Sequence, residues 1–297
     1  MINEKIVPRS FGTHDGSFHA DEVTACALLI IFNKIDLKKI VRTRDENRLC
    51  TCEYVCDVGG VYDPKKKKFD HHQSDYKGIY SSAGMVLKHL KSSKVISRRL
   101  YHYLNRSLIK GVDAIDNGKA SPPMGHSSFS SVISNFVPAK HDIKPQILHQ
   151  AFLQALKFCI GHIRRLIDKF HHIQECYVEI QAEMEKNKEV LFFERPMPWL
   201  DIFFELGGEY HPALFVIMPI GMGKQWKLRA VPPTHKKQMQ VRMPLPKEWA
   251  GLIDTELKKK SKIPGALFCH KGRFISVWDT KESAIAACEY VLKNRKR

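Results

Sequence analysis

The chain has 297 residues, which is long enough for two domains that each bury a core of their own. Lysine and arginine total 48 against 31 acidic residues, and the formal charge of +17 favours a polyanionic partner such as RNA, DNA or a phosphorylated metabolite. No apolar run approaches the roughly 18 residues that span a bilayer, and the first residues contain no signal-peptide core, so we expect a cytoplasmic protein without a membrane partner.

The first part of the chain alternates between strand-like and helix-like segments. Short apolar runs predict strands at residues 5–11, 39–43 and 53–58. Apolar residues at helical spacing predict a helix over residues 21–32. Such alternation predicts a parallel sheet covered on both faces, in which ligands gather at the carboxyl ends of the strands. His14 follows the first predicted strand, and Asp57 lies at the end of the third.

The eight cysteines are scattered, and we expect them to be free thiols. Cys50, Cys52 and Cys56 have the spacing of a partial zinc cluster. That run leads into a predicted strand, however, and no second cluster stands at a finger-like spacing. A thiolate zinc site is therefore not expected.

Residues 62–69 predict a tight basic turn, which leads into the triplet Asp70-His71-His72. Helical spacing follows at residues 81–90 and 98–115. Asp113 and Asp116 are three residues apart and therefore share one face of the second of these helices.

The middle of the chain predicts a loop and then a long helical segment. Residues 121–138 are rich in serine and proline, and we expect a loop that borders the active site. Residues 143–187 show aliphatic side chains at three- and four-residue steps, which predicts a helical connection between two domains.

The sequence changes character from about residue 191, where all four tryptophans occur. Strands are predicted at 213–219 and 227–231, a hairpin at 265–278 and a closing helix at 283–293. The tryptophans could stack on bases, but we favour a place in the core for each of them: Trp199, Trp226, Trp249 and Trp278. The expected domains are a catalytic domain at 1–140, a helical connector at 141–190 and a smaller α+β domain at 191–297.

The histidines and carboxylates of the first domain suit hard or borderline divalent cations, with Mn²⁺ as the leading choice and Mg²⁺ as the alternative. We expect two ions, because a pair of ions can activate a water and stabilise the leaving oxygen of a phosphoester. One ion is assigned to His14, His19 and Asp57. The other is assigned to Asp21, Asp57, His71 and Asp116, with Asp57 as the bridge.

Two assignments within this set stay open. Asp113 could replace Asp116 as the ligand, although its apolar neighbours Val112 and Ala114 make it the weaker candidate. Asp70 and His72 are assigned to the catalytic machinery beside the ions. His72 is the best candidate for the general acid, and Asp70 would fix the tautomer of a histidine.

Several motifs together resemble the Myg family (melanocyte proliferating gene family), a branch of the DHH phosphoesterases. They are GTHDGSFHADE (12–22), VRTRD (41–45), DVGG (57–60), FDHHQ (69–73), SSAG (81–84), VDAIDNG (112–118) and IPGALFCH (263–270). The resemblance implies a DHH-like α/β domain that holds the metals and a C-terminal domain that contacts the substrate. It further implies a 3′–5′ RNA exonuclease, as eukaryotic members are described.

Basic residues are the expected contacts to the substrate phosphates: Arg42 and Arg44 after the second strand, and His270, Lys271 and Arg273 in the C-terminal hairpin. The expected partner is an RNA or a short oligonucleotide, and a homodimer is left open. Two alternatives remain. One is a small-substrate phosphoesterase, either a pyrophosphatase or a short-nucleotide phosphodiesterase. The other is a nucleic-acid-binding protein whose metal site is degenerate.

Overall fold

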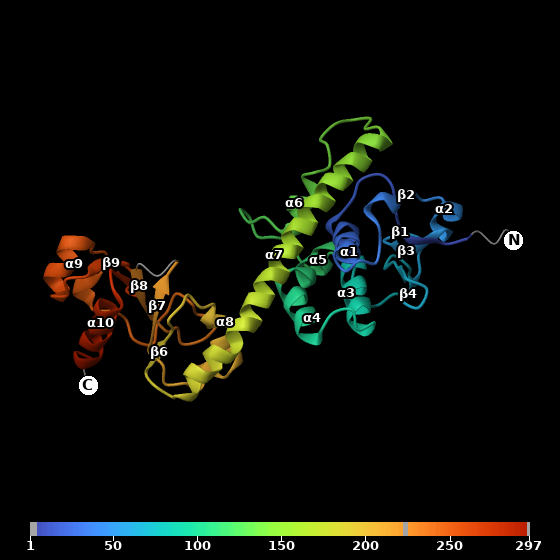
Figure 1. Ribbon diagram of the computed structural model, residues 1–297. Coiled ribbons are helices and arrows are strands. Elements are labelled where there is room, and N and C mark those ends of the chain that lie inside the picture. The colour runs from blue at the N-terminus through green and yellow to red at the C-terminus, as the bar shows by residue number, and fades with distance from the viewer. Residues whose placement is uncertain (1–4, 222–224, 296–297) are drawn as a thin grey trace. The chain divides into compact units, whose positions relative to one another are not determined.

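The computed structural model describes residues 5–221 and 225–295, and it divides the chain into two compact units, 1–170 and 171–297 (Figure 1). The first unit contains five strands: β1 (Val7–Thr13), β2 (Ile40–Arg42), β3 (Cys52–Cys56), β4 (Tyr62–Asp63) and β5 (Lys68–Phe69). Its helices are α1 (Ala20–Ile31), α2 (Glu46–Cys50), α3 (Ser82–Ser92), α4 (Arg98–Leu104), α5 (Lys110–Asp116), α6 (Phe129–Ser134) and the first part of α7 (Pro145–Glu185).

The strands of the first unit form one sheet in the order β2-β1-β3-β5-β4. All neighbouring pairs are parallel except β4 with β5, which form an antiparallel hairpin around the basic turn. This sheet confirms the parallel α/β domain expected from the sequence. Because β1, β3 and β5 run in the same direction, their carboxyl ends meet at one edge.

The main core of this unit covers one face of the sheet. Phe11, Tyr54 and Phe69 from three adjacent strands are at most 3% exposed and belong to the same apolar cluster as the buried residues of α1 and α3. A smaller cluster includes Leu49 of α2 and Val55 of β3. Since Tyr54 and Val55 are successive strand residues, they point to opposite faces, and the sheet is covered on both.

One expectation for this unit was wrong. Residues 121–138 were predicted as a loop, but the short helix α6 lies within them. The side chain of Ser128 accepts a hydrogen bond from the backbone N–H of Ser131 and caps this helix, and Ile133 anchors it in the core. The serine-rich composition therefore marks a helix cap as well as a loop.

Helix α7 covers most of the segment that the sequence predicts as a connector, and it continues from the first unit into the second. The second unit contains β6 (Val190–Phe192), β7 (Phe215–Ile220), β8 (Gln225–Ala230), β9 (Ala266–Cys269) and β10 (Ile275–Trp278), with the helices α8 (Trp199–Glu205), α9 (Asp254–Ser261) and α10 (Lys281–Lys293). Its sheet has the order β6-β7-β8-β10-β9 and is antiparallel apart from β6 with β7.

The core of the second unit contains Trp226, Trp249 and Trp278, packed with the buried face of α10. Trp199 of α8 is also buried, at 3% exposure. The four tryptophans therefore lie in the interior, as expected from the sequence. No helix among residues 5–221 and 225–295 is long and apolar enough to cross a membrane.

Candidate metal centre

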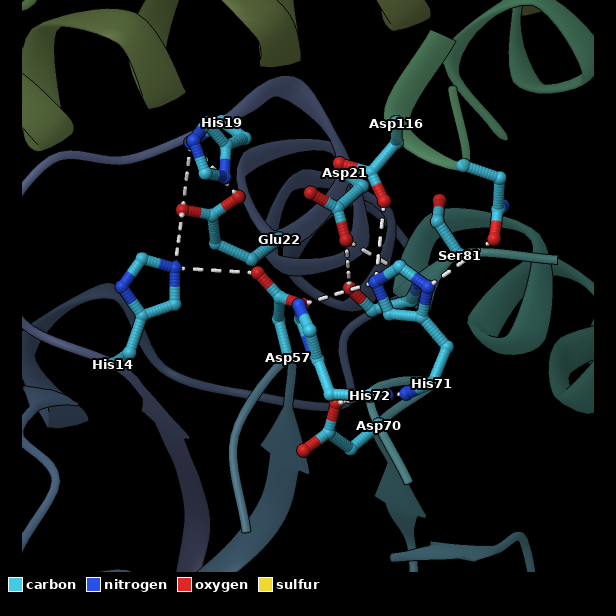
Figure 2. Close-up of polar contacts among 12 residues, drawn as sticks. His14, His19, Asp21, Glu22, Asp57, Asp70, His71, His72, Ser81 and Asp116 are labelled. Atoms are coloured by element: carbon cyan, nitrogen blue, oxygen red, sulfur yellow. Dashed lines mark hydrogen bonds and ion pairs between the residues drawn. The ribbon is translucent and has the colours of Figure 1, made fainter. Parts of the chain in front are cut away.

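The edge of the first sheet carries three of the four histidines and two of the carboxylates expected from the sequence, Asp57 and Asp70. His14 follows β1, Asp57 follows β3, and His71 and His72 follow β5 (Figure 2). Asp57 adopts a left-handed backbone conformation, with φ at 58°. Aspartate accepts this conformation more readily than most residues, and it turns the chain sharply at the strand end.

Three further carboxylates come from helices. Asp21 and Glu22 lie in the first turn of α1, and Asp116 is the last residue of α5. The N-cap residue His19 donates its backbone N–H to Glu22, with distances of 2.9 and 3.1 Å to the two carboxylate oxygens. This capping box fixes the Glu22 side chain at the helix start.

His14 joins β1 to this helix. Its Nε2 lies 3.3 Å from Oε1 of Glu22 and 3.2 Å from Oδ2 of Asp57. Its Nδ1 lies 2.8 Å from the carbonyl oxygen of Asp15, which can only accept a hydrogen bond. The neutral imidazole therefore carries its proton on Nδ1 and presents a free lone pair on Nε2, the arrangement that a metal-binding histidine needs.

His71 has the same relation to a second pair of carboxylates. Its Nε2 lies 3.3 Å from Oδ1 of Asp57 and 3.1 Å from Oδ2 of Asp116. Its Nδ1 lies 3.4 Å from the side-chain oxygen of Asn117, which accepts a hydrogen bond from the Nδ1–H of the neutral ring. Asp57 thus directs one oxygen to His14 and the other to His71, which suits a ligand that bridges two ions.

Three buried carboxylate oxygens in this cluster have no hydrogen-bond partner among the described residues: Oδ1 of Asp21, Oδ1 of Asp57 and Oδ2 of Asp116. Asp21 is 0% exposed and Asp57 is 4% exposed. Oδ1 of Asp57 and Oδ2 of Asp116 still lie 3.3 and 3.1 Å from Nε2 of His71. Buried carboxylates are strongly unfavourable unless a positive charge compensates them, so this cluster needs either protonated histidines or bound metal ions. Nitrogen and oxygen ligands in this mixture fit divalent Mn²⁺ or Mg²⁺.

The pKa values of these residues describe the protonation of the cluster in the metal-free protein. Burial alone would lower the pKa of His14 and of His71, but Asp57 together with Glu22 or Asp116 raises each to about 10. Burial would raise the pKa of Asp57, but His14 and His71 lower it to about 2. Burial and the charges of Asp57, Glu22 and Asp116 raise the pKa of Asp21 well above its usual value.

Asp70 supports the neighbouring loop. Its Oδ1 accepts hydrogen bonds from the backbone N–H groups of His71 and His72 and lies 2.7 Å from Nδ1 of His72. Its Oδ2 accepts from the N–H of Gly60 at 2.6 Å. The His72 side chain is 63% exposed, and its Nδ1 is also 3.4 Å from Asp57. Asp70 therefore orients His72, which lines the open side of the cluster.

The structure separates the roles of Asp113 and Asp116. Oδ1 of Asp113 accepts hydrogen bonds from the N–H and hydroxyl of Ser81 and from the N–H of Gly84, so it caps the start of α3. A Cβ at Gly84 would lie 2.2 Å from Oδ2 of Asp113, so this approach requires glycine. Asp113 serves the helix, and Asp116 faces His71.

An open pocket of about 620 Å³ lies over the cluster and is lined by His14, His19, Asp57, His72 and Arg44, among others. Arg44 is largely exposed and lies 3.4 Å from Asp15. Arg42 does not line this pocket. Its guanidinium lies over the rings of Phe152 and Phe18, beside the pocket rather than within it.

The other three predicted substrate residues lie in the second unit, at the turn between β9 and β10. The N–H of Gly272 donates to Nδ1 of His270, and Arg273 adopts a left-handed backbone conformation. Lys271 is exposed. His270 therefore shapes this turn, and its ring contacts Phe274 with a centroid distance of 4.4 Å.

Some functional candidates were missed by sequence reasoning. Glu22 belongs to the cluster, and its signal was the capping-box spacing from His19. Lys227 and Arg229 occupy alternate positions on β8, so they share one face of the second sheet. Both are half-buried, burial lowers both pKa values, and neither has an acidic partner among the described residues.

Comparison with known proteins assigns the chain to a family. The model of the MYG1 exonuclease family, described as an uncharacterised protein family (UPF0160), matches residues 10–292. The chain belongs to this family. A MYG1 protein of Chlamydia trachomatis serovar D is 50% identical over 98% of this chain and 99% of its own length. The human MYG1 exonuclease is 27% identical over 98% of this chain and 87% of its own length.

Among solved structures, a pGpG-specific phosphodiesterase from Vibrio cholerae aligns over 97% of this chain and 98% of its own, with 11% identity and a TM-score of 0.33. That overlap is too weak to support a conclusion about function. The family assignment itself confirms the resemblance that the motifs indicated. It also confirms the expected class of protein, a hydrolase that acts on phosphoester bonds.

Proposed function

We propose that this protein is a metal-dependent 3′–5′ exonuclease that hydrolyses RNA. The observation that carries the proposal is the cluster of buried carboxylates and histidines at the sheet edge, in which three carboxylate oxygens form no hydrogen bond within the described residues. Family membership supports the same chemistry, because relatives in this family are named exonucleases. The excess of 48 basic over 31 acidic residues favours a polyanionic substrate over pyrophosphate.

Two divalent cations, with Mn²⁺ preferred over Mg²⁺, would occupy the cluster. His14, His19, Glu22 and Asp57, which lie together, would hold one ion. The other is assigned to Asp21, Asp57, His71 and Asp116, in which His71 contacts Asp57 and Asp116, and Asp21 lies beside Asp116 and His19. This adds Glu22 to the set expected from the sequence. When bound, such a pair lowers the pKa of a coordinated water and offsets charge that develops on the phosphoryl oxygens.

The chain's own residues orient the ligands and handle protons. Asp15 and Asn117 accept from the Nδ1 atoms of His14 and His71, which keeps both Nε2 lone pairs directed into the cluster. Asp70 holds His72 through Nδ1, and the exposed Nε2 of that ring would donate a proton to the leaving oxygen. Arg44, on the rim of the pocket, would contact a phosphoryl oxygen of the substrate.

The test is a Mn²⁺ titration with RNA oligonucleotides labelled at the 3′ or the 5′ end, for the natural protein and an Asp57→Asn variant. We expect stepwise loss of the 3′ label that requires Mn²⁺ and falls on the order of a hundredfold or more in the variant, because Asp57 is shared by both halves of the cluster. Asp168→Asn, on the exposed side of α7, is the matched control and should keep full activity.

Three results would change the assignment. Loss of the 5′ label first would reverse the proposed polarity. Hydrolysis of pyrophosphate or of a dinucleotide without cleavage of longer RNA would support the metal centre but contradict RNA as the substrate. Full activity in the Asp57→Asn variant would show that the proposal of a two-ion centre is wrong. The cytoplasmic location stays a prediction, and a homodimer stays open.

A further inference from the structure

A second groove lies beside the metal pocket in the first unit. It has a volume of about 380 Å³ and is lined by residues at the end of β2, in α2 and at the start of α7. Asp15 and Gly16 line both this groove and the metal pocket, so the two hollows are neighbours that share one loop as a wall. We call it the Arg42 groove, after the arginine in its lining.

Arg42 is a fixed cation that forms no direct ion pair among the described residues, although the charges of Glu22 and Asp15 act on it from further away. Its guanidinium carbon lies 4.9 Å from the ring centroid of Phe152 and 5.5 Å from that of Phe18. Its Nη2 donates to the carbonyl oxygen of Gly16 at 2.6 Å, whereas its Nε is buried with no partner in the described part of the chain. No carboxylate there forms an ion pair with it. Stacking and one hydrogen bond hold the group in place while its charge stays available.

The rest of the lining adds one further cation and an imidazole that is neutral at neutral pH. Arg48 is exposed and has no ion pair within the described ranges. His149 lies on α7, and burial together with the charge of Arg42 lowers its pKa. The one acidic residue in the lining, Asp15, lies 3.4 Å from Arg44 and is partly neutralised by it.

Two amide side chains complete the lining. Gln146 and Gln150 stand four residues apart on α7 and therefore lie on the same face of that helix. Amides can donate to phosphate oxygens and can also accept from sugar hydroxyls, unlike arginine, which only donates. The lining thus offers one fixed cation, one exposed cation and several neutral polar groups, which is the pattern of a phosphodiester subsite rather than of an apolar ligand pocket.

We propose that the Arg42 groove binds the phosphodiester next to the one hydrolysed at the metal centre, on a single-stranded oligonucleotide. The inference rests on the proposed function for the identity of the neighbouring site. The inference goes further, because it states that the enzyme contacts at least two successive phosphates of the strand. Substrates with a single phosphodiester would leave the groove empty and would be hydrolysed less efficiently than longer strands.

The test compares the trinucleotide ApApA, which has two phosphodiesters, with the dinucleotide ApA, which has one, under saturating Mn²⁺. For the natural protein we expect a higher kcat/KM for ApApA. In Arg48→Gln and in Gln146→Ala this preference should fall, by roughly tenfold for the charged contact. Both residues are exposed, so neither substitution should disturb folding. Arg106→Gln, an exposed arginine outside the groove, is the matched control and should leave the preference unchanged.

A binding measurement separates this proposal from the proposed function. Fluorescence anisotropy with a labelled penta-adenylate in EDTA needs no hydrolysis. Arg48→Gln should weaken binding and reduce the slope of log Kd against log salt by about one. If the protein hydrolyses RNA but Arg48→Gln changes neither the preference nor the slope, the groove proposal is wrong and the exonuclease stands. If nothing is hydrolysed but the slope falls, the groove stands and the exonuclease proposal is wrong.

Discussion

Glu22 shows how one residue serves both folding and the candidate centre. Its carboxylate accepts the backbone N–H of His19 at the start of α1, and the same side chain lies 3.3 Å from His14. The positive end of the helix dipole stabilises a negative charge in this first turn. The ligand is therefore held in position by the helix before any ion binds. Its acidic neighbour Asp21 drew attention in the sequence, so Glu22 was overlooked.

Binding of divalent ions should release protons at neutral pH. The pKa values of about 10 leave His14 and His71 protonated in the metal-free protein, and an ion can bind Nε2 only after the proton leaves. We expect close to two protons released per protein at pH 7.5. Calorimetric titration with Mn²⁺ in buffers of different ionisation enthalpy measures this number. A binding heat that is the same in every buffer would contradict it.

The same two histidines set the pH dependence of the metal-free protein. Their folded pKa values lie above the ordinary 6.5, so their contribution to the free energy of unfolding is complete below about pH 6.5 and is lost as the pH rises toward 10. Asp57 acts in the opposite direction, since its contribution is lost only as the pH falls from about 3.8 toward 2. Bound Mn²⁺ should abolish this loss of unfolding free energy between about pH 6.5 and 10, because the ions replace the protons on the two histidines. His126→Gln, an exposed histidine, should leave it unchanged.

At the scale of elements, α3 depends on a carboxylate from α5. Oδ1 of Asp113 accepts hydrogen bonds from Ser81 and Gly84 at the start of α3. Asp113→Ala should therefore lower the free energy of unfolding by about 1–3 kcal/mol, because it removes a buried helix cap. The number of Mn²⁺ ions bound should not change. Urea unfolding and calorimetry measure the two quantities.

Asp116→Ala is the matched partner of that variant, three residues along the same helix. It should lose affinity for one ion and should also lower the free energy of unfolding of the metal-free protein at neutral pH, because protonated His71 loses one of its two carboxylate partners. If the two variants exchanged these behaviours, Asp113 would be the ligand and Asp116 the structural residue.

Elements with a strong local pattern were predictable. The strands β1, β2 and β3, the helices α1, α3 and α7 and the β9–β10 hairpin follow apolar periodicity and turn residues. Short elements were not, since tertiary contacts decide them. Strand β6 has three residues and exists through its pairing with β7, and α6 depends on the burial of Ile133. The choice between Asp113 and Asp116 was equally out of reach, because it depends on where α3 begins in space.

For the whole molecule, the excess of basic residues predicts a salt-dependent enzyme. Cations that neutralise phosphates release condensed counter-ions, so kcat/KM for an RNA strand should fall roughly tenfold between 50 and 200 mM KCl if two or three phosphates are contacted. Hydrolysis of bis(p-nitrophenyl) phosphate, which has one phosphate, should change little. Equal salt dependence for both substrates would show that the enzyme does not contact several phosphates of the RNA strand.

The metal centre joins parts of the chain that are far apart in sequence. His14, Asp57 and His71 follow three different strands, whereas Asp21 and Asp116 belong to two helices packed against them. Ions that bind only this assembled arrangement stabilise the folded chain by mass action. Protein made in a cell short of the ion would lack this stabilisation and would open more often to proteases. Ion supply would then control how much of this enzyme a cell keeps, in addition to how fast each copy works.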